Sequence, residues 1–259
     1  MNIQSPSAVI DPVATVTHVR VRRWFYINVA LGVIGLNLAS FGPSIVAPSS
    51  RTVPLPLTPL VVAHTAIACA WILFFLGQSV LIATGRTRLH RRWGVVGGVL
   101  AVMFVVVGCL AAIDEARRGF DLSGDLVPRG TMPDPSFILA PVNAFPLFAV
   151  LVGAALWYRR RPEIHKRLML LTMLGPVAGA PIAHLVGHWS ALRGVALPVA
   201  LGSTVLLLSL SAIHDWFSEC RVHPVSVWGA VGTFVWFNMF FVVIAPSAAW
   251  RDFTAWLIA

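Results

Sequence analysis

Histidines are the residues of this chain best suited to chemistry, and most of the eight lie near the ends of long apolar segments. His184 and His188 are one helical turn apart, so both imidazoles would face the same side of a helix. Many metal sites take two ligands from one helix at this spacing. His64 is a third candidate ligand, and Asp114 or Glu115 could bind the metal or orient a histidine. The pattern predicts a metal site, and neutral imidazole suits Zn, Cu and Fe alike.

A second pair, His90 and His165, opens two long apolar runs in the same way. Residues 89–92 read LHRR and residues 164–167 read IHKR, so each histidine follows an apolar residue and precedes two basic ones. The repeat predicts two related hairpins that hold both histidines at one depth, where they could bind a haem iron from two sides. Three neighbouring arginines would then bind the haem propionates: Arg91, Arg92 and Arg167.

Each pair also has a plainer interpretation. His90 and His165 could anchor helix ends at the membrane surface beside their arginine neighbours, and for this pair alone the sequence favours that interpretation. His184 and His188 could lie at the opposite surface beside Trp189, paired with carbonyl groups and lipid headgroups. The sequence leaves both alternatives open.

The elements that must position these histidines are seven stretches of at least 20 residues without Asp, Glu, Lys or Arg. A helix needs about 20 apolar residues to cross a bilayer, and within lipid only a helix or a closed barrel satisfies its own backbone. The stretches are 24–50, 52–85, 93–113, 135–158, 168–192, 194–214 and 222–250. We therefore predict an all-α integral membrane protein with seven transmembrane helices.

Charge supports the same class and predicts the topology. Hydrophobic residues make up 58% of the chain and charged residues 11%, which excludes an ordinary soluble domain. With the N-terminus in the cytoplasm and the C-terminus outside, 13 of the 19 Lys and Arg residues lie on the inner side. The net charge of +9 therefore follows topology and indicates a lipid bilayer, not nucleic acid, as partner. We expect a disordered cytoplasmic tail at 1–20, a single transmembrane domain at 21–259 and an outer loop at 114–134.

Several of these motifs resemble a family of predicted bacterial membrane proteins of unknown function. The likeness consists of His64 followed by Gln78, of LHRRWG at 89–94 and of HKRLM at 165–169. The family pattern has His and later Gln on one helix, then an His-Arg-x-x-Gly entry and a later His-Arg-x-Trp-Met entry. The chain departs from it at the second and fourth positions of the last motif. The resemblance covers about residues 60–185 and implies a multi-pass protein of the bacterial inner membrane, without an activity.

A weaker likeness to two-haem transmembrane b-type cytochromes implies haem b and electron transfer, with a membrane protein or a quinone-type carrier as partner. The sequence lacks the GxSxG, P-loop and HExxH motifs, and it identifies no catalytic residue. Three functions stay open: a haem or redox-metal protein, a metal-dependent membrane hydrolase, and an accessory or assembly subunit without metal. The first is favoured because histidines cluster near helix ends while carboxylates for acid–base chemistry are scarce.

Overall fold

All regular elements that the computed structural model describes are helical. It describes the backbone of residues 12–47, 56–120, 122, 135–188 and 196–259, and the side chains of most of them, His188 excepted. The elements are α1 (Pro12–Val46), α2 (Pro59–Ala83), α3 (Thr87–Arg117), α4 (Pro135–Ile138), η2 (Ala140–Asn143), α5 (Ala144–Trp157), α6 (Pro162–Thr172), η3 (Met173–Val177), α7 (Ala178–His188), α8 (Ala196–Glu219), α9 (Pro224–Met239), η5 (Phe240–Ile244) and α10 (Ala248–Ile258).

Six helical segments among the described residues are long and apolar enough to cross a membrane. They are Trp24–Val46, Pro59–Ala83, Thr87–Arg117, Ala140–Trp157, Pro162–Val186 and Pro224–Ile244. Their outward faces carry large apolar side chains, such as Val95, Val150 and Trp157. A water-soluble protein would not expose so much apolar surface, so length and composition fit a multi-pass membrane protein.

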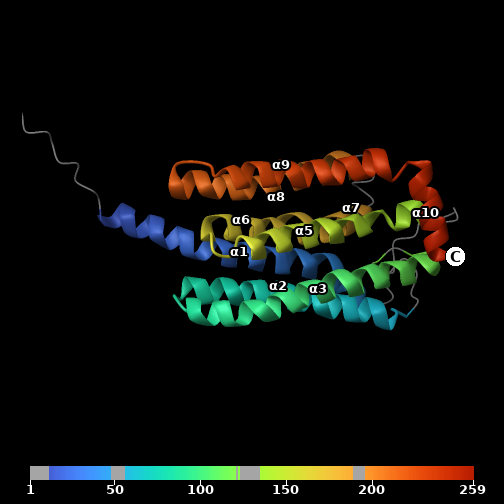
Figure 1. Ribbon diagram of the computed structural model, residues 1–259, viewed down its shortest axis with the longest axis horizontal. Coiled ribbons are helices and arrows are strands. Elements are labelled where there is room, and N and C mark those ends of the chain that lie inside the picture. The colour runs from blue at the N-terminus through green and yellow to red at the C-terminus, as the bar shows by residue number, and fades with distance from the viewer. Residues whose placement is uncertain (1–11, 48–55, 121, 123–134, 189–195) are drawn as a thin grey trace, which may run out of the picture.

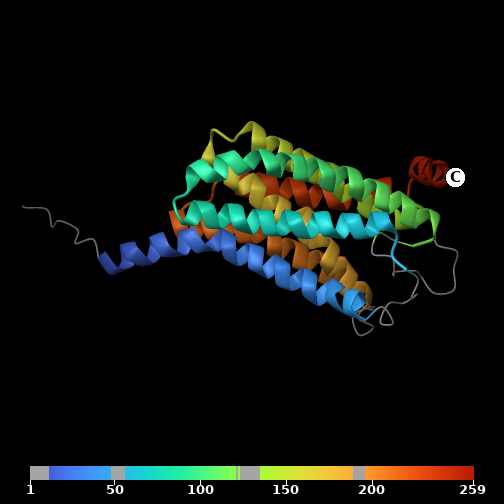
Figure 2. The same ribbon diagram turned by 90° about the horizontal axis from the view of Figure 1, so that it is seen from below.

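The helices form three layers with their long axes roughly along one direction (Figure 1). α8 and α9 make one outer layer, α2 and α3 make the other, and α1, α5, α6 and α7 lie between them. α10 lies across one end of this bundle, and the view turned by 90° shows it almost end-on (Figure 2). We call the end with α10 the far end.

The opposite end, which we call the basic end, holds three short turns at residues 84–86, 158–161 and 220–223. Gly85 has a φ of 76°, a left-handed conformation that glycine adopts without strain, and it closes the α2–α3 turn. Pro162 and Pro224 stand at the first positions of α6 and α9, where proline costs no hydrogen bond. These local signals produce antiparallel neighbours with arginine-rich ends.

The core lies where α2, α3 and α5 meet the middle of the bundle. Trp71 packs edge-on against Phe148 at 4.9 Å between ring centroids, and Phe104 lies 4.6 Å from the same ring. All three side chains are buried, and α1 and α7 cover the cluster with smaller residues such as Ala30 and Ala178. Aromatic packing thus fixes α2 and α3 against the middle layer.

Three of the seven expected spans are irregular among the described residues. The stretch 222–250 passes from α9 into the π-helical segment η5, and the other two are interrupted as follows. The stretch 135–158 divides into α4, η2 and α5, and Pro141 lies at the start of η2, where it replaces a backbone donor. The stretch 168–192 begins earlier, at Pro162. It passes through the π-helical segment η3, which contains Pro176, and continues as α7, which contains Pro181.

The chain ends also differ from expectation. α1 begins at Pro12, within the expected tail, while residues 1–11 lie outside the described part. α3 continues to Arg117, so the expected loop starts four residues later, and most of it is not described. The last expected span, 222–250, ends at Ile244, and α10 then turns away after Ser247, whose hydroxyl caps it by accepting from Trp250 N.

Candidate functional site

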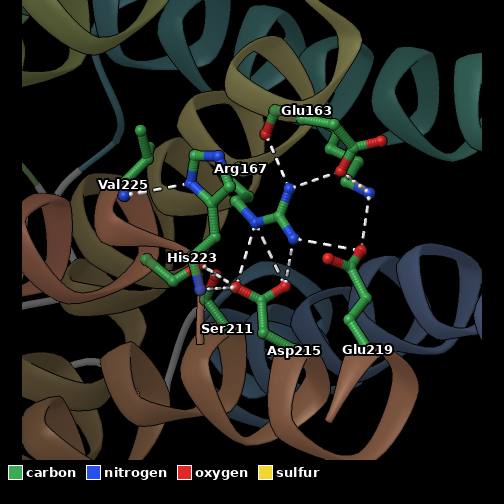
Figure 3. Close-up of polar contacts among 9 residues, drawn as sticks. Glu163, Arg167, Ser211, Asp215, Glu219, His223 and Val225 are labelled. Atoms are coloured by element: carbon green, nitrogen blue, oxygen red, sulfur yellow. Dashed lines mark hydrogen bonds and ion pairs between the residues drawn. The ribbon is translucent and has the colours of Figure 1, made fainter. Parts of the chain in front are cut away.

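The most polar part of the described interior is a group of ion pairs near the basic end, centred on Arg167. Its side chain on α6 is 1% exposed, and that of Asp215 on α8 is 2% exposed. Arg167 Nη2 lies 2.6 Å from Asp215 Oδ1, and its Nε lies 3.0 Å from both carboxylate oxygens. The guanidinium thus faces the carboxylate with two nitrogens, the geometry that favours arginine over lysine (Figure 3).

Three further charged residues complete this group, which we call the Arg167 cluster: Glu163, Lys166 and Glu219. Glu163 Oε2 accepts from Arg167 Nη1 at 2.7 Å and from Lys166 Nζ at 2.5 Å. Glu219 Oε1 lies 3.2 Å from Arg167 Nη2 and 3.4 Å from Lys166 Nζ. Because a buried charge is costly without partners, this ring of carboxylates is what allows Arg167 to lie inside the bundle.

Asp215 also connects α8 to α9. Ser226 Oγ donates to Asp215 Oδ2 at 2.5 Å, and the backbone N–H of His223 donates to the same oxygen at 3.1 Å. Ser211 Oγ in turn donates to Ser226 Oγ at 2.9 Å. Donors from α6 and from the N-terminal end of α9 therefore surround the buried carboxylate on α8.

His223 lies at the N-terminus of α9 and caps that helix. Its Nδ1 accepts a hydrogen bond from Val225 N at 3.1 Å, so the imidazole is neutral and carries its proton on Nε2. Burial lowers the pKa of His223, and the positive charge of Arg167 lowers it further. The ring lines an open pocket of about 410 Å³ together with Glu163, Glu219 and Arg221.

His90 and His165 come together on the other side of α6, as the paired motifs predict. Their ring centroids are 6.3 Å apart and the ring planes are 77° apart. His165 Nδ1 lies 2.7 Å from the carbonyl oxygen of Ala155, so that nitrogen donates and Nε2 is left for another partner. His90 Nδ1 is buried and has no hydrogen-bond partner within the described part of the chain.

The surroundings of this histidine pair are polar on one side. Gln78 on α2 lies within hydrogen-bonding reach of His90 through its backbone, and its buried Oε1 has no partner among the described residues. Arg91 and Arg92 are exposed next to His90. Arg167, the third arginine expected here, instead directs its donors to the carboxylates of its own cluster.

The outer histidines lie in two different environments. His64 on α2 packs between Phe104 and Phe145, with ring centroids 5.3 and 5.7 Å away, and its buried Nδ1 has no partner among the described residues. His184 on α7 faces α1, where Ser40 Oγ lies 3.0 Å from its Nδ1. The side chain of His188 lies outside the described part.

The carboxylates expected beside these histidines are on the last turn of α3. Glu115 is buried, and its Oε1 accepts from Arg118 Nη1 at 2.6 Å. Asp114 is half-buried. Nowhere in the described ranges do three His, Cys, Asp or Glu side chains gather as metal ligands.

Sequence reasoning missed the Arg167 cluster, although a signal was present. Glu163 and Arg167 are four residues apart, and so are Asp215 and Glu219, which places each set on one helical face. Both sets stand at helix ends that topology brings to the same side of a membrane.

No family model, curated protein or solved structure matches the chain.

Proposed function

We propose that this is a seven-span protein of a bacterial inner membrane with its basic end in the cytoplasm. α8 would be the seventh span, since it has 24 residues, packs along α9 and carries no charge between residues 196 and 214. The excess of Lys and Arg at the basic end supports the orientation through the positive-inside rule. The N-terminus would then be cytoplasmic and the C-terminus outside.

We further propose that the protein binds a redox-active transition metal, as haem iron or as a bare ion, through His90 and His165. The observation that carries this proposal is the approach of their rings to 6.3 Å between centroids, from two helices that start at the same end of the bundle. One metal ion fits between two imidazoles at that separation, because metal–nitrogen bonds are about 2.0–2.1 Å for an ion such as Zn²⁺.

The neighbouring groups support the same proposal. A metal-binding histidine usually donates its other ring nitrogen to a carbonyl or carboxylate, and His165 Nδ1 has such a partner in the Ala155 carbonyl. The unpartnered His90 Nδ1 and Gln78 Oε1 are the kind of buried polar atoms that a bound group would satisfy. Arg91 and Arg92 are available for an anionic substituent such as a propionate.

The function we infer is electron transfer within the membrane. The bound metal would supply one-electron chemistry, and the chain would supply two neutral imidazoles and a basic surface beside them. A buried polar atom is costly without a partner, and the unpartnered His90 Nδ1 therefore favours a working site over an incidental histidine. A quinone-type carrier or another membrane protein would exchange the electron.

The test is to purify the whole protein in mild detergent and record visible spectra, oxidised and dithionite-reduced, with metal analysis of the same sample. We expect a Soret band that shifts on reduction, or stoichiometric iron or copper. The double variant His90→Asn and His165→Asn should lose the bound haem or metal. The matched double variant His64→Asn and His184→Asn should retain it. Retention of the metal in the first double variant would contradict the assignment.

Other results would point to the other functions. A colourless protein with bound zinc would favour a metal-dependent hydrolase. A protein without haem or metal would favour an accessory subunit, in which both histidines anchor helix ends.

A further inference from the structure

Two buried polar atoms of the α2–α3 hairpin, Gln78 Oε1 and His90 Nδ1, have no hydrogen-bond partner among the described residues. Gln78 lies five residues before the end of α2, and His90 lies on the first turn of α3. The two helices pack side by side (Figure 1). The backbone of Gln78 lies within hydrogen-bonding reach of the His90 ring, so both side chains start from one small region of the hairpin.

The two atoms are chemically complementary. The amide oxygen of a glutamine only accepts hydrogen bonds, and an imidazole Nδ1 that carries the ring proton donates one. A buried polar atom without a partner is costly. A hydrogen bond from His90 Nδ1–H to Gln78 Oε1 would therefore remove two such costs at once.

His165 has the corresponding arrangement on the other side of the pair. Its Nδ1 lies 2.7 Å from the carbonyl oxygen of Ala155, which leaves Nε2 for another partner. A carbonyl acceptor on one ring nitrogen fixes the tautomer and the orientation of a metal-binding imidazole. With Gln78 as the acceptor for His90, both rings would offer Nε2 to a metal across 6.3 Å between their centroids.

The two acceptors differ in one respect. Ala155 contributes a backbone oxygen, whereas Gln78 contributes a side chain that can be exchanged. An amide is a neutral acceptor, so its hydrogen bond is weaker than one to a carboxylate. Glutamine at this position would orient His90 without adding negative charge to the imidazole. The side chain at position 78 therefore controls how strongly His90 donates electrons to a bound metal.

We propose that Gln78 is the positioning residue of the His90–His165 site. Its amide oxygen accepts from His90 Nδ1–H and so turns His90 Nε2 toward the metal. This role rests on the proposed function, because it requires that the two histidines hold a metal.

The experiment measures the metal affinity and the reduction potential of the whole protein in detergent. Gln78→Leu removes the acceptor, so the affinity should fall about 10–100-fold and the potential should rise. Gln78→Glu supplies a carboxylate that strengthens His90 as a donor, so the potential should fall. We expect each shift to be about 59 mV, which is a tenfold change in the affinity for oxidised over reduced metal in a one-electron couple. Spectra at neutral and alkaline pH ensure that the introduced carboxyl is ionised.

Ser79→Ala is the matched control on the same helix. The Ser79 hydroxyl donates to the Phe75 carbonyl of α2 itself, so its removal should leave the potential unchanged. A purely structural role of Gln78 would shift the potentials of Gln78→Leu and Gln78→Glu in the same direction, or would lower only their melting temperatures. Either result would overturn the positioning role and leave the metal site in place. A natural protein without metal would instead overturn the proposed function and this role together.

Discussion

Arg167 and Asp215 are 48 positions apart in the chain and form a buried ion pair, with Arg167 Nη2 2.6 Å from Asp215 Oδ1. The pair joins α6 to α8, and Ser226 extends it to α9. Because both charges have lost their water, the helices cannot slide past one another without exposing an unpaired charge to an apolar interior. The pair thus fixes the relative depth of three helices.

Removal of one partner of this pair should destabilise the protein strongly. Asp215→Asn leaves Arg167 buried with an incomplete set of carboxylates, which typically costs about 3–5 kcal/mol. Thermal unfolding in detergent would measure it, with Asp252→Asn on the exposed face of α10 as control. The double variant Arg167→Met with Asp215→Leu should lose less stability than Arg167→Met and Asp215→Leu lose in sum when made separately. Additive losses would contradict the coupling of the two residues.

Thr233 should tolerate, and even favour, an apolar replacement. It is 1% exposed, and its Oγ1 has no hydrogen-bond partner among the described residues. Thr233→Val keeps the shape and removes the unsatisfied hydroxyl, so we expect about 1 kcal/mol of added stability. The matched control is Thr254→Val, which removes a bond to the Arg251 carbonyl and should lower the melting temperature. A less stable Thr233→Val would show that the hydroxyl has a partner.

Gly108 should not accept even one methyl group. A Cβ atom there would lie 3.0 Å from His64 Nδ1 and closer still to the ring of Phe145. Gly108→Ala should therefore cost about 1–3 kcal/mol through overpacking. Gly153→Ala on α5, where no atom lies within 4 Å of the added carbon, should gain about 0.5–1 kcal/mol from helix propensity. Equal melting temperatures for the two variants would disagree with this packing.

Stability should fall in weak acid because of His223. Its pKa is lower in the folded protein than in the unfolded chain, so the unfolded state binds more protons between the two values. The stabilisation of the folded protein by neutral His223 is fully present above about pH 6.5, the pKa in the unfolded chain. It is lost as the pH falls toward the lower pKa of the folded protein. His223→Ser keeps a capping side chain without titration. Its melting temperature should therefore fall less than that of the natural protein between pH 7.5 and 5.5; parallel curves would exclude this role.

Much of the helical architecture could be predicted from the sequence. Charge-free stretches place α2, α3 and α9, because the need to satisfy backbone hydrogen bonds in lipid leaves few alternatives to a helix. The repeated motifs around His90 and His165 predict that the rings share one end of the bundle, and their separation of 6.3 Å agrees. Both features follow from short stretches of sequence, because helix formation and the place where a helix begins depend mainly on neighbouring residues.

The tertiary structure decided which polar residues meet. His64 and His184, predicted as one site, face different neighbours, Phe145 and Ser40, because rotation of each helix about its own axis is set by packing. Arg167, predicted beside a haem, is turned toward Asp215. Sequence determines that buried charges need partners; only the packing of α6 against α8 and α9 decides that the partner is Asp215, since that choice depends on the register of helices far apart in the chain.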